Sequence, residues 1–200
     1  MPALVPMPVS TRERILESAR AILVEEGFRA LSTRAVATRA GCSIGTIYNH
    51  FRDFDDVVLH LNAETLTQLG EALAAAAKNP PAKRPAALVD AYFDFVEANE
   101  ASWSALFQHY PPPGYDLPDW YRATIESVVR GAIGALDELL AGTPDEERDG
   151  LVIALWSGLH GLASLDRQSK LATVTPGASA RTLGHLLVSS ALRGAGWTGR

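Results

Sequence analysis

Cysteine is almost absent from this sequence, and its scarcity excludes several classes of protein. The single residue, Cys42, cannot form a disulfide within the chain, which excludes a disulfide-stabilised secreted scaffold. One thiolate is also too few for a cysteine-rich zinc site, and the five histidines show no metal-ligand spacing. We therefore expect neither a metal site nor a cofactor. We expect Cys42 to be a small core side chain rather than a nucleophile.

Long apolar runs are missing as well. The longest uncharged apolar stretch, residues 151–165, has 15 residues and contains His160, so it is too short to span a bilayer. Residues 1–10 contain no lysine or arginine and lack the apolar region of a signal peptide. These absences predict a cytoplasmic protein that has no membrane partner.

The sequence motifs of helical enzymes are not found either. There is no His-Glu-x-x-His motif, no Glu-x-x-His pair, no glycine-rich phosphate loop and no cysteine–histidine pair at a local spacing. We therefore predict that the chain is not an enzyme.

Positive charge is scarce overall but concentrated near the N-terminus. The net charge of the chain is −5. Residues 1–52 contain seven arginines and four glutamates, which gives them a net charge of +3 and leaves −8 on the remainder. A positive segment attached to an acidic body suits a nucleic-acid-binding head, although a segment of +3 is also common by chance.

Helical periodicity extends over the whole chain, whereas no strand-like alternation of useful length is present. Beyond the first fifty-odd residues, helices are expected over 54–78, 85–99, 118–140, 144–168 and 178–193, with a short aromatic helix near 103–110. With three earlier helices this makes about nine. We therefore predict an all-α fold. We expect a small three-helix head, residues 1–55, followed by a larger helical body, residues 56–200.

The N-terminal segment has the pattern of a helix-turn-helix. A first helix after Ser10 has one apolar face, made of Ile15, Leu16, Ala19, Ile22 and Leu23. Two short helices follow, over 33–39 and 44–50, and the turn between them contains Gly41, which tolerates positive φ. Ala37 is small enough for the point where the two helices cross. The inner face is completed by Val36, Ala40, Cys42 and Ile47.

The string G-T-I-Y-N-H-F at residues 45–51, with R-E-R-I-L at 12–16 and the helix-turn-helix itself, resembles the TetR family of repressors. The resemblance covers residues 11–60, and it implies a DNA-binding domain over residues 1–55 and a ligand-binding and dimerisation domain over residues 56–200. It implies that the helix over 44–50 enters the major groove of operator DNA and that the start of the preceding helix contacts phosphate. The DNA-binding residues implied in this way are Ser32, Thr33, Arg34, Ser43, Ile44, Gly45, Thr46, Tyr48, Asn49 and His50. The implied function is a transcriptional regulator that acts as a repressor, and an activator with the same head is the open alternative.

The chain departs from the TetR pattern near the recognition helix. Ile44 and Phe54 stand where many members carry lysine, and Asp53, Asp55 and Asp56 add negative charge close by. Since each missing phosphate contact removes about one counterion from the salt dependence, we expect weaker non-specific DNA affinity than is typical. The arginines that can compensate in part are Arg12, Arg34, Arg39 and Arg52. The three aspartates are interpreted as helix N-terminal charge rather than a metal site.

Two copies of the head need a two-fold dimer to read two half-sites. The last two long helices carry apolar and small stripes that suit a homodimer seam. These stripes are Leu151, Leu155, Gly158, Leu162 and Leu165 in one helix, and Leu183, Gly184, Leu186, Leu187 and Ala191 in the other. The stretch W-x-x-x-H-G-L-A-x-L from Trp156 also resembles a TetR-type C-terminal domain named for its Trp, His and Gly, over about 85–195.

The body is rich in aromatic residues, which suit either a packed core or an apolar ligand pocket. The family mechanism implies that a small apolar or aromatic effector of unknown identity binds there and releases the operator. Candidate effector-binding residues are His60, Tyr92, Phe93, Trp103, Phe107, Tyr110, Trp120, Trp156 and His160. A fully packed body would instead favour a ligand-independent or partner-controlled regulator.

Overall fold

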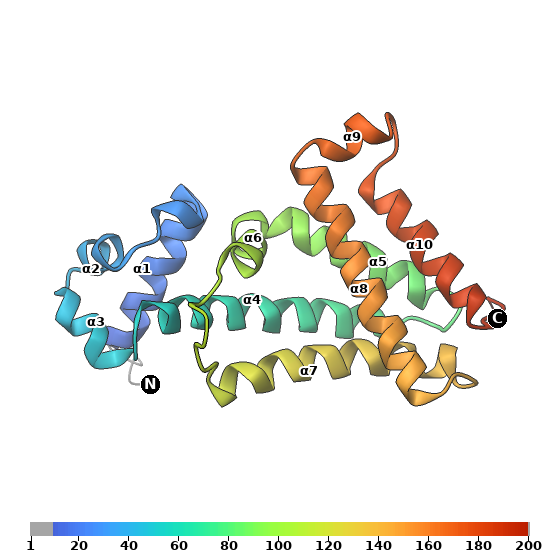
Figure 1. Ribbon diagram of the computed structural model, residues 1–200, viewed down its shortest axis with the longest axis horizontal. Helices are drawn as coiled ribbons and strands as arrows, with labels where there is room; N and C mark the ends of the chain where they lie inside the picture. Colours follow the sequence, from blue (N-terminus) through green and yellow to red (C-terminus); the bar gives the residue numbers. More distant parts are fainter. Residues whose placement is uncertain (1–9, 200) are drawn as a thin grey trace, which may run out of the picture. The chain divides into compact units, whose positions relative to one another are not determined.

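The computed structural model describes residues 10–199, which form helices and connecting turns without a β-strand (Figure 1). The ten α-helices of these residues are α1 (Thr11–Glu26), α2 (Thr33–Ala40), α3 (Ile44–His50), α4 (Phe54–Ala77), α5 (Arg84–Ala98), α6 (Glu100–Gln108), α7 (Asp119–Leu136), α8 (Asp145–Arg167), α9 (Lys170–Val174) and α10 (Ala180–Gly194). Two 3₁₀ helices are η1 (Phe28–Ala30) and η2 (Asp137–Leu140). The predicted all-α fold is confirmed. Residues 1–9, for which the sequence predicts no signal peptide, and residue 200 lie outside the described residues.

Contacts within the chain divide the described residues into two compact units. The first contains residues 10–65 and 100–121, and the second contains residues 66–99 and 122–199. The long helix α4 therefore begins in the first unit and ends in the second. The functional border expected between residues 55 and 56 is not tested by this division and stays a prediction.

Local capping explains where α1 begins and ends. Ser10 Oγ accepts a hydrogen bond from the Glu13 amide at 3.2 Å, and Glu13 Oε2 accepts one from the Ser10 amide at 2.8 Å. This capping box satisfies two amide groups that have no partner within the first turn of a helix. The helix ends before Gly27, whose φ of 85° lies in the region that favours glycine.

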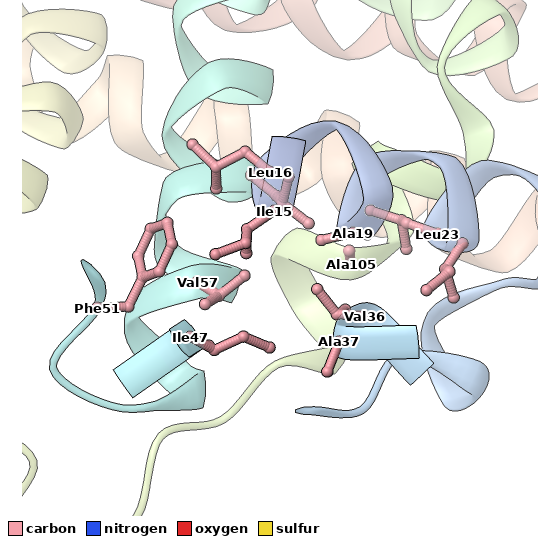
Figure 2. Close-up of a cluster of buried hydrophobic side chains, with 12 residues drawn as sticks. Ile15, Leu16, Ala19, Leu23, Val36, Ala37, Ile47, Phe51, Val57 and Ala105 are labelled. Atoms are coloured by element: carbon pink, nitrogen blue, oxygen red, sulfur yellow. The ribbon is translucent and has the colours of Figure 1, made fainter. Parts of the chain in front are cut away.

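The core of the first unit is formed by α1, α2, α3 and the start of α4 (Figure 2). Ile15 of α1, Val36 of α2 and Ile47 of α3 are completely buried in it. Ala105 of α6 packs into the same cluster, so this unit contains more than the first three helices. Gly41, with a φ of 64°, makes the predicted left-handed turn between α2 and α3. This packing fixes the orientation of α3 within the unit.

Close contacts between helices hold the second unit together. Helix α10 packs against both α8 and α5. At Gly184 of α10 the approach is so close that a Cβ atom would lie 2.7 Å from the ring of Phe93 and 2.9 Å from Leu159. At Gly158 of α8 a Cβ atom would lie 2.5 Å from Leu187 of α10. Both glycines, which the sequence placed in the dimer stripes, therefore pack within one protomer.

The expected helices differ from the structure in several places. The short aromatic helix expected near 103–110 is α6, which begins at Glu100 and ends at Gln108. The five-residue helix α9 between α8 and α10 was not predicted, because one turn and a half is too short to show a periodicity. The single helix expected over 118–140 is α7 followed by the 3₁₀ helix η2. Leu139 and Leu140 of η2 are buried, so the apolar pattern continues through the change of helix type. No helix in the described part of the chain is long and apolar enough to cross a membrane.

Candidate nucleic-acid interface

Helix α3 presents one face to the core and the opposite face to solvent. Ile47 is buried, and the residues on the other side of the helix are exposed. Tyr48 is 51% exposed and Ile44 is 42% exposed, which is high for large apolar side chains. Asn49 and His50 are exposed as well. Packing inside the unit therefore does not explain why these four residue types occur here. Their side chains are accessible to a binding partner of α3.

Two hydroxyl groups at the start of α3 are engaged in capping the helix. Ser43 Oγ accepts a hydrogen bond from the Thr46 amide at 3.1 Å. The hydroxyl oxygens of Ser43 and Thr46 are hydrogen-bonded to one another at 2.9 Å. A hydroxyl group has one proton and two lone pairs, so each can still accept from or donate to a further group. In the structure, however, these hydroxyl groups stabilise the N-terminus of α3.

The start of α2 is a second exposed helix N-terminus. Ser32 Oγ accepts a hydrogen bond from the Ala35 amide at 3.3 Å, and Thr33 is half-buried. Arg34 is exposed in the first turn of the helix. Amide groups at a helix N-terminus, together with a guanidinium, form a favourable environment for an anion such as a phosphate group.

Two of the arginines expected to contact DNA already contact carboxylates of their own chain. Arg39 Nη2 lies 2.6 Å from Glu25, and Arg39 Nη1 lies 3.5 Å from Glu26. Arg52 lies 3.4 Å from Asp53, and its guanidinium stacks 4.5 Å above the ring of Tyr115. A hydrogen bond with Tyr115 raises the pKa of the Arg52 guanidinium above its ordinary value. These pairings lower the net positive charge available to phosphate.

Two of the three aspartates at the start of α4 have partners in the segment that follows α6. Asp53 Oδ1 accepts hydrogen bonds from the Asp56 amide at 2.7 Å and from the Tyr115 hydroxyl at 3.0 Å. Asp55 Oδ1 lies 2.8 Å from Nε2 of His109. The interpretation of these carboxylates as N-terminal helix charge agrees with the cap that Asp53 makes. The sequence contains no signal for the partners, because they lie 54 and 62 residues away.

His60 lies among aromatic rings of the first unit. Its ring centroid is 5.5 Å from that of Phe51 and 4.2 Å from that of Trp120. His60 Nδ1 lies 3.0 Å from the Asp56 carbonyl oxygen. Burial and the nearby Arg12 guanidinium lower the pKa of His60, so its neutral form is favoured. His60 and Trp120 were predicted to bind an effector, and here they pack against each other.

Residues of the second unit line a small, partly open cavity of about 70 Å³. Of the nine residues predicted to bind an effector, Tyr92 and Trp156 line it. The remaining lining is aliphatic and was missed by sequence reasoning, because helical periodicity marks core residues without distinguishing a cavity wall. These residues are Leu73, Pro85, Leu88, Val89, Ala132, Leu136, Val152, Leu155, Leu159 and Val188.

The other predicted effector-binding residues are not part of this lining. His160 stacks on Trp156 with ring centroids 6.1 Å apart, and burial lowers the pKa of its imidazole. Phe93 is buried against α10. Trp103 and Phe107 pack together on α6, and Tyr110 is 82% exposed. Of the predicted set, Tyr92 and Trp156 therefore line this cavity, and an effector-binding role for the nine residues stays a prediction. Among the described residues, no group of three or more His, Cys, Asp or Glu side chains is placed to hold a metal ion.

Two segments of the chain match models of known protein families. Residues 15–61 match the family model for bacterial regulatory proteins of the tetR family. Residues 85–189 match the model described as tetracyclin repressor-like, C-terminal domain. The chain belongs to the TetR family of transcriptional regulators. It is therefore a regulator rather than an enzyme, as the sequence predicted, whereas the narrower Trp-His-Gly type of C-terminal domain stays a prediction.

The sequence is also similar to individual helix-turn-helix transcriptional regulators. The chain is 27% identical to an uncharacterized HTH-type transcriptional regulator of Mycobacterium tuberculosis, over 78% of this chain and 70% of the relative. It is 35% identical to the HTH-type transcriptional repressor KstR of Rhodococcus jostii, over 37% of this chain and 33% of the relative. The second match therefore spans only about a third of that repressor.

Solved structures show the same fold at lower sequence identity. A protein of unknown function from Rhodococcus sp. RHA1 has a TM-score of 0.74 and 22% identity, covering 96% of this chain and 98% of that protein. The multidrug binding protein EbrR, solved in complex with imidazole, has a TM-score of 0.61 and 19% identity, covering 91% of this chain and 94% of that protein.

Proposed function

We propose that this TetR-family regulator is a repressor that binds operator DNA through α3 and α2 and is released by a small apolar or aromatic effector. The observation that carries the DNA-binding part is the solvent-facing side of α3, where Tyr48, Asn49 and His50 are exposed beside Ile44. Large side chains exposed on a short helix, next to a second exposed helix N-terminus, fit a helix that enters the major groove. Binding to operator DNA requires a cytoplasmic location.

The proposed DNA contacts divide into two groups. Residues at the start of α2 contact phosphate, since they combine helix amides with a guanidinium: Ser32, Thr33 and Arg34. Residues of the recognition helix contact base edges and flanking phosphates: Ser43, Ile44, Gly45, Thr46, Tyr48, Asn49 and His50. Contacts of the first group position the protein, and contacts of the second group supply sequence preference.

A homodimer through α8 and α10 is part of this proposal. On these helices Ile153, Trp156 and Leu165 of α8 and Leu186 of α10 are exposed large apolar side chains. Exposed apolar residues gathered on adjacent helices are typical of an interface. The buried members of the predicted stripes, such as Leu155, pack inside one chain. The proposed dimer interface is therefore made by the outward-facing residues of the same two helices.

The proposed effector site is the cavity between α4, α5, α7, α8 and α10 of the second unit. Its lining contains no charged side chain, and Tyr92 and Trp156 are the lining residues that have a polar side-chain atom. An uncharged apolar or aromatic molecule therefore suits it. EbrR, which shares the fold, is a multidrug binding protein. To release DNA, the effector must bind the state that does not bind DNA more tightly, because equal affinity shifts no equilibrium.

One observation favours a second candidate, a regulator that needs no small ligand. The cavity of about 70 Å³ is smaller than the roughly 300–1,000 Å³ of common ligand pockets. A closely packed body of this kind also suits a repressor controlled by a protein partner or by its own concentration.

Selection of bound duplexes from random or genomic DNA tests the DNA-binding part. We expect the wild-type protein to enrich a sequence with two half-sites and the Tyr48→Ala variant to bind that sequence at least tenfold more weakly. The matched control is Tyr110→Ala, which removes an even more exposed tyrosine outside α3 and is expected to leave binding unchanged. Equal affinity of wild type and Tyr48→Ala would contradict the assignment of α3.

Thermal unfolding with small probes separates the two candidate functions. We expect toluene at millimolar concentration to raise the Tm, and benzoate, which has a similar size but carries a charge, to leave it unchanged. Val152→Phe places a larger side chain in the cavity wall and should abolish the toluene effect while operator binding persists. If toluene does not shift the Tm and no uncharged probe weakens operator binding, the ligand-independent regulator is the better assignment.

A further inference from the structure

The solvent-facing side of α3 contains an aliphatic side chain, Ile44, that does not take part in the core. Ile44 stands in the first turn of α3 and is 42% exposed, while the core contact of this helix is made by Ile47, which is buried. Ile44 and Tyr48 are four residues apart, so they are neighbours on one side of the helix. Exposure of a β-branched aliphatic residue at this place offers an apolar contact to whatever α3 binds.

The surroundings of Ile44 leave this apolar surface open. The two nearby hydroxyls, of Ser43 and Thr46, are hydrogen-bonded to each other and to the start of the helix. A Cβ atom built at the neighbouring Gly45 would meet only the Ser43 hydroxyl oxygen, at 3.7 Å, so the surface beside Gly45 is open apart from Ser43. A ligand surface can therefore approach the backbone of α3 closely beside Ile44.

The chemistry of the major groove restricts what an isoleucine can read there. Guanine, cytosine and adenine present hydrogen-bond donors and acceptors on this edge, whereas thymine also presents a C5-methyl group. An isoleucine packed over a polar base edge removes water from that edge without replacing its hydrogen bonds, which is unfavourable. Over the thymine methyl, the same side chain buries apolar surface on both partners.

We propose that Ile44 is a specificity-determining residue that reads the C5-methyl group of one thymine in each half-site of the operator. This inference rests on the proposed binding of operator DNA through α3 and adds the base that one residue selects. Many TetR-family members carry lysine at the position of Ile44. In this chain, a charged contact with a phosphate group or a base edge is therefore replaced by an apolar contact that depends on the DNA sequence.

Replacement of thymine by uracil tests the inference, because it removes the C5-methyl group and keeps the hydrogen-bonding groups of the base. The probe is the duplex that the wild-type protein selects from random sequences, with each thymine replaced in turn. We expect one thymine per half-site at which uracil weakens wild-type binding about fourfold, and about 15-fold when both half-sites are changed. The Ile44→Ala variant should show no penalty at that thymine and unchanged penalties elsewhere.

Two further variants make the comparison specific to the side chain of Ile44. Ile44→Val keeps a branched aliphatic group and should retain the uracil penalty, and Tyr48→Phe should retain it because the proposed methyl contact is not made by the tyrosine hydroxyl. Identical uracil penalties in wild type and Ile44→Ala at every thymine would overturn the assignment while leaving operator binding intact. Failure of the wild type to enrich any sequence would overturn operator binding and, with it, this assignment.

Discussion

His109 Nε2 lies 2.8 Å from Oδ1 of Asp55, and only 7% of the His109 side chain is exposed. The two residues are 54 positions apart in the chain, and their contact joins the end of α6 to the first turn of α4. The ring of His109 also meets the ring of Phe28 edge-on, with centroids 6.2 Å apart. This polar contact is one reason why residues 100–121 belong to the same compact unit as the helix-turn-helix.

Removal of this contact should destabilise the first unit. His109→Ala leaves the Asp55 carboxylate without its buried partner, so we expect the free energy of unfolding to fall by about 1–3 kcal/mol. The measurement is urea unfolding followed by circular dichroism. Tyr110→Ala, at the neighbouring exposed position, should change the value by less than about 0.5 kcal/mol. Equal effects of the two substitutions would show that the His109–Asp55 contact contributes little.

Two glycine-to-alanine substitutions should have opposite effects on stability. Gly184→Ala places a methyl group 2.7 Å from Phe93 and 2.9 Å from Leu159, so these side chains or the helices that carry them must shift, at a cost of about 1–3 kcal/mol. Gly131→Ala on α7 meets no atom within 4 Å and favours the helix, so it should stabilise the protein by about 0.5–1 kcal/mol. Thermal unfolding of both variants beside wild type checks the signs. A Gly184→Ala variant as stable as wild type would mean that α10 can move away without loss.

The imidazole of His60 should make stability depend on pH. Burial lowers its pKa in the folded protein, with a further contribution from Arg12, while Asp56 and Glu64 oppose the shift. As the pH falls below about 6.5, the unfolded chain binds a proton at this residue before the folded chain does. The free energy of unfolding should therefore decrease as the pH falls from about 7 towards 5, and level off below the folded pKa.

His60→Phe provides the comparison for this pH dependence. Phenylalanine keeps an aromatic ring between Phe51 and Trp120 but does not titrate. Unfolding free energies at several pH values between about 5 and 7 should therefore vary less in His60→Phe than in wild type. The carboxylates and the other histidines contribute to both proteins alike, so parallel curves would show that His60 does not contribute.

A charge on the exposed face of α10 should prevent dimerisation. Leu186 is 58% exposed in the isolated chain, and Leu186→Arg would place a guanidinium in the proposed α8–α10 seam, where it has no partner. Sedimentation equilibrium should show a monomer, and operator affinity should fall because one head reads one half-site. Ile125→Arg, on the exposed side of α7, is the matched control and should remain dimeric. A dimeric Leu186→Arg variant would exclude this seam.

The helix-turn-helix could be predicted from the sequence because the interactions that define it are local. Each of the serines Ser10, Ser32 and Ser43 caps a helix through an amide three residues later, and Gly41 alone supplies the left-handed turn. Apolar residues at helical spacing then determine which face is buried. For the same reason, the exposed residues of α3 could be placed before the tertiary structure was known.

The candidate effector residues were less predictable, since an aromatic side chain fits a core as well as a pocket. Tyr92 and Trp156 line the cavity, whereas Phe93 is packed against Gly184. Nothing in their local sequence distinguishes these environments, because the distinction depends on which helix lies opposite. The aliphatic residues that complete the cavity wall have the same periodicity as any core residue.

The all-α fold, the TetR-like head and the position of the recognition helix could be predicted without a structure, because capping and periodicity act over a few residues. The long-range partners of these elements are known only from the folded chain. Asp55 could be placed at a helix N-terminus from its position, but its contact with His109 depends on folding of the chain between them. Likewise, the burial of Ile47 could be predicted from the apolar spacing, but which residues of α1 and α2 cover it follows from the packing of α3 against these helices.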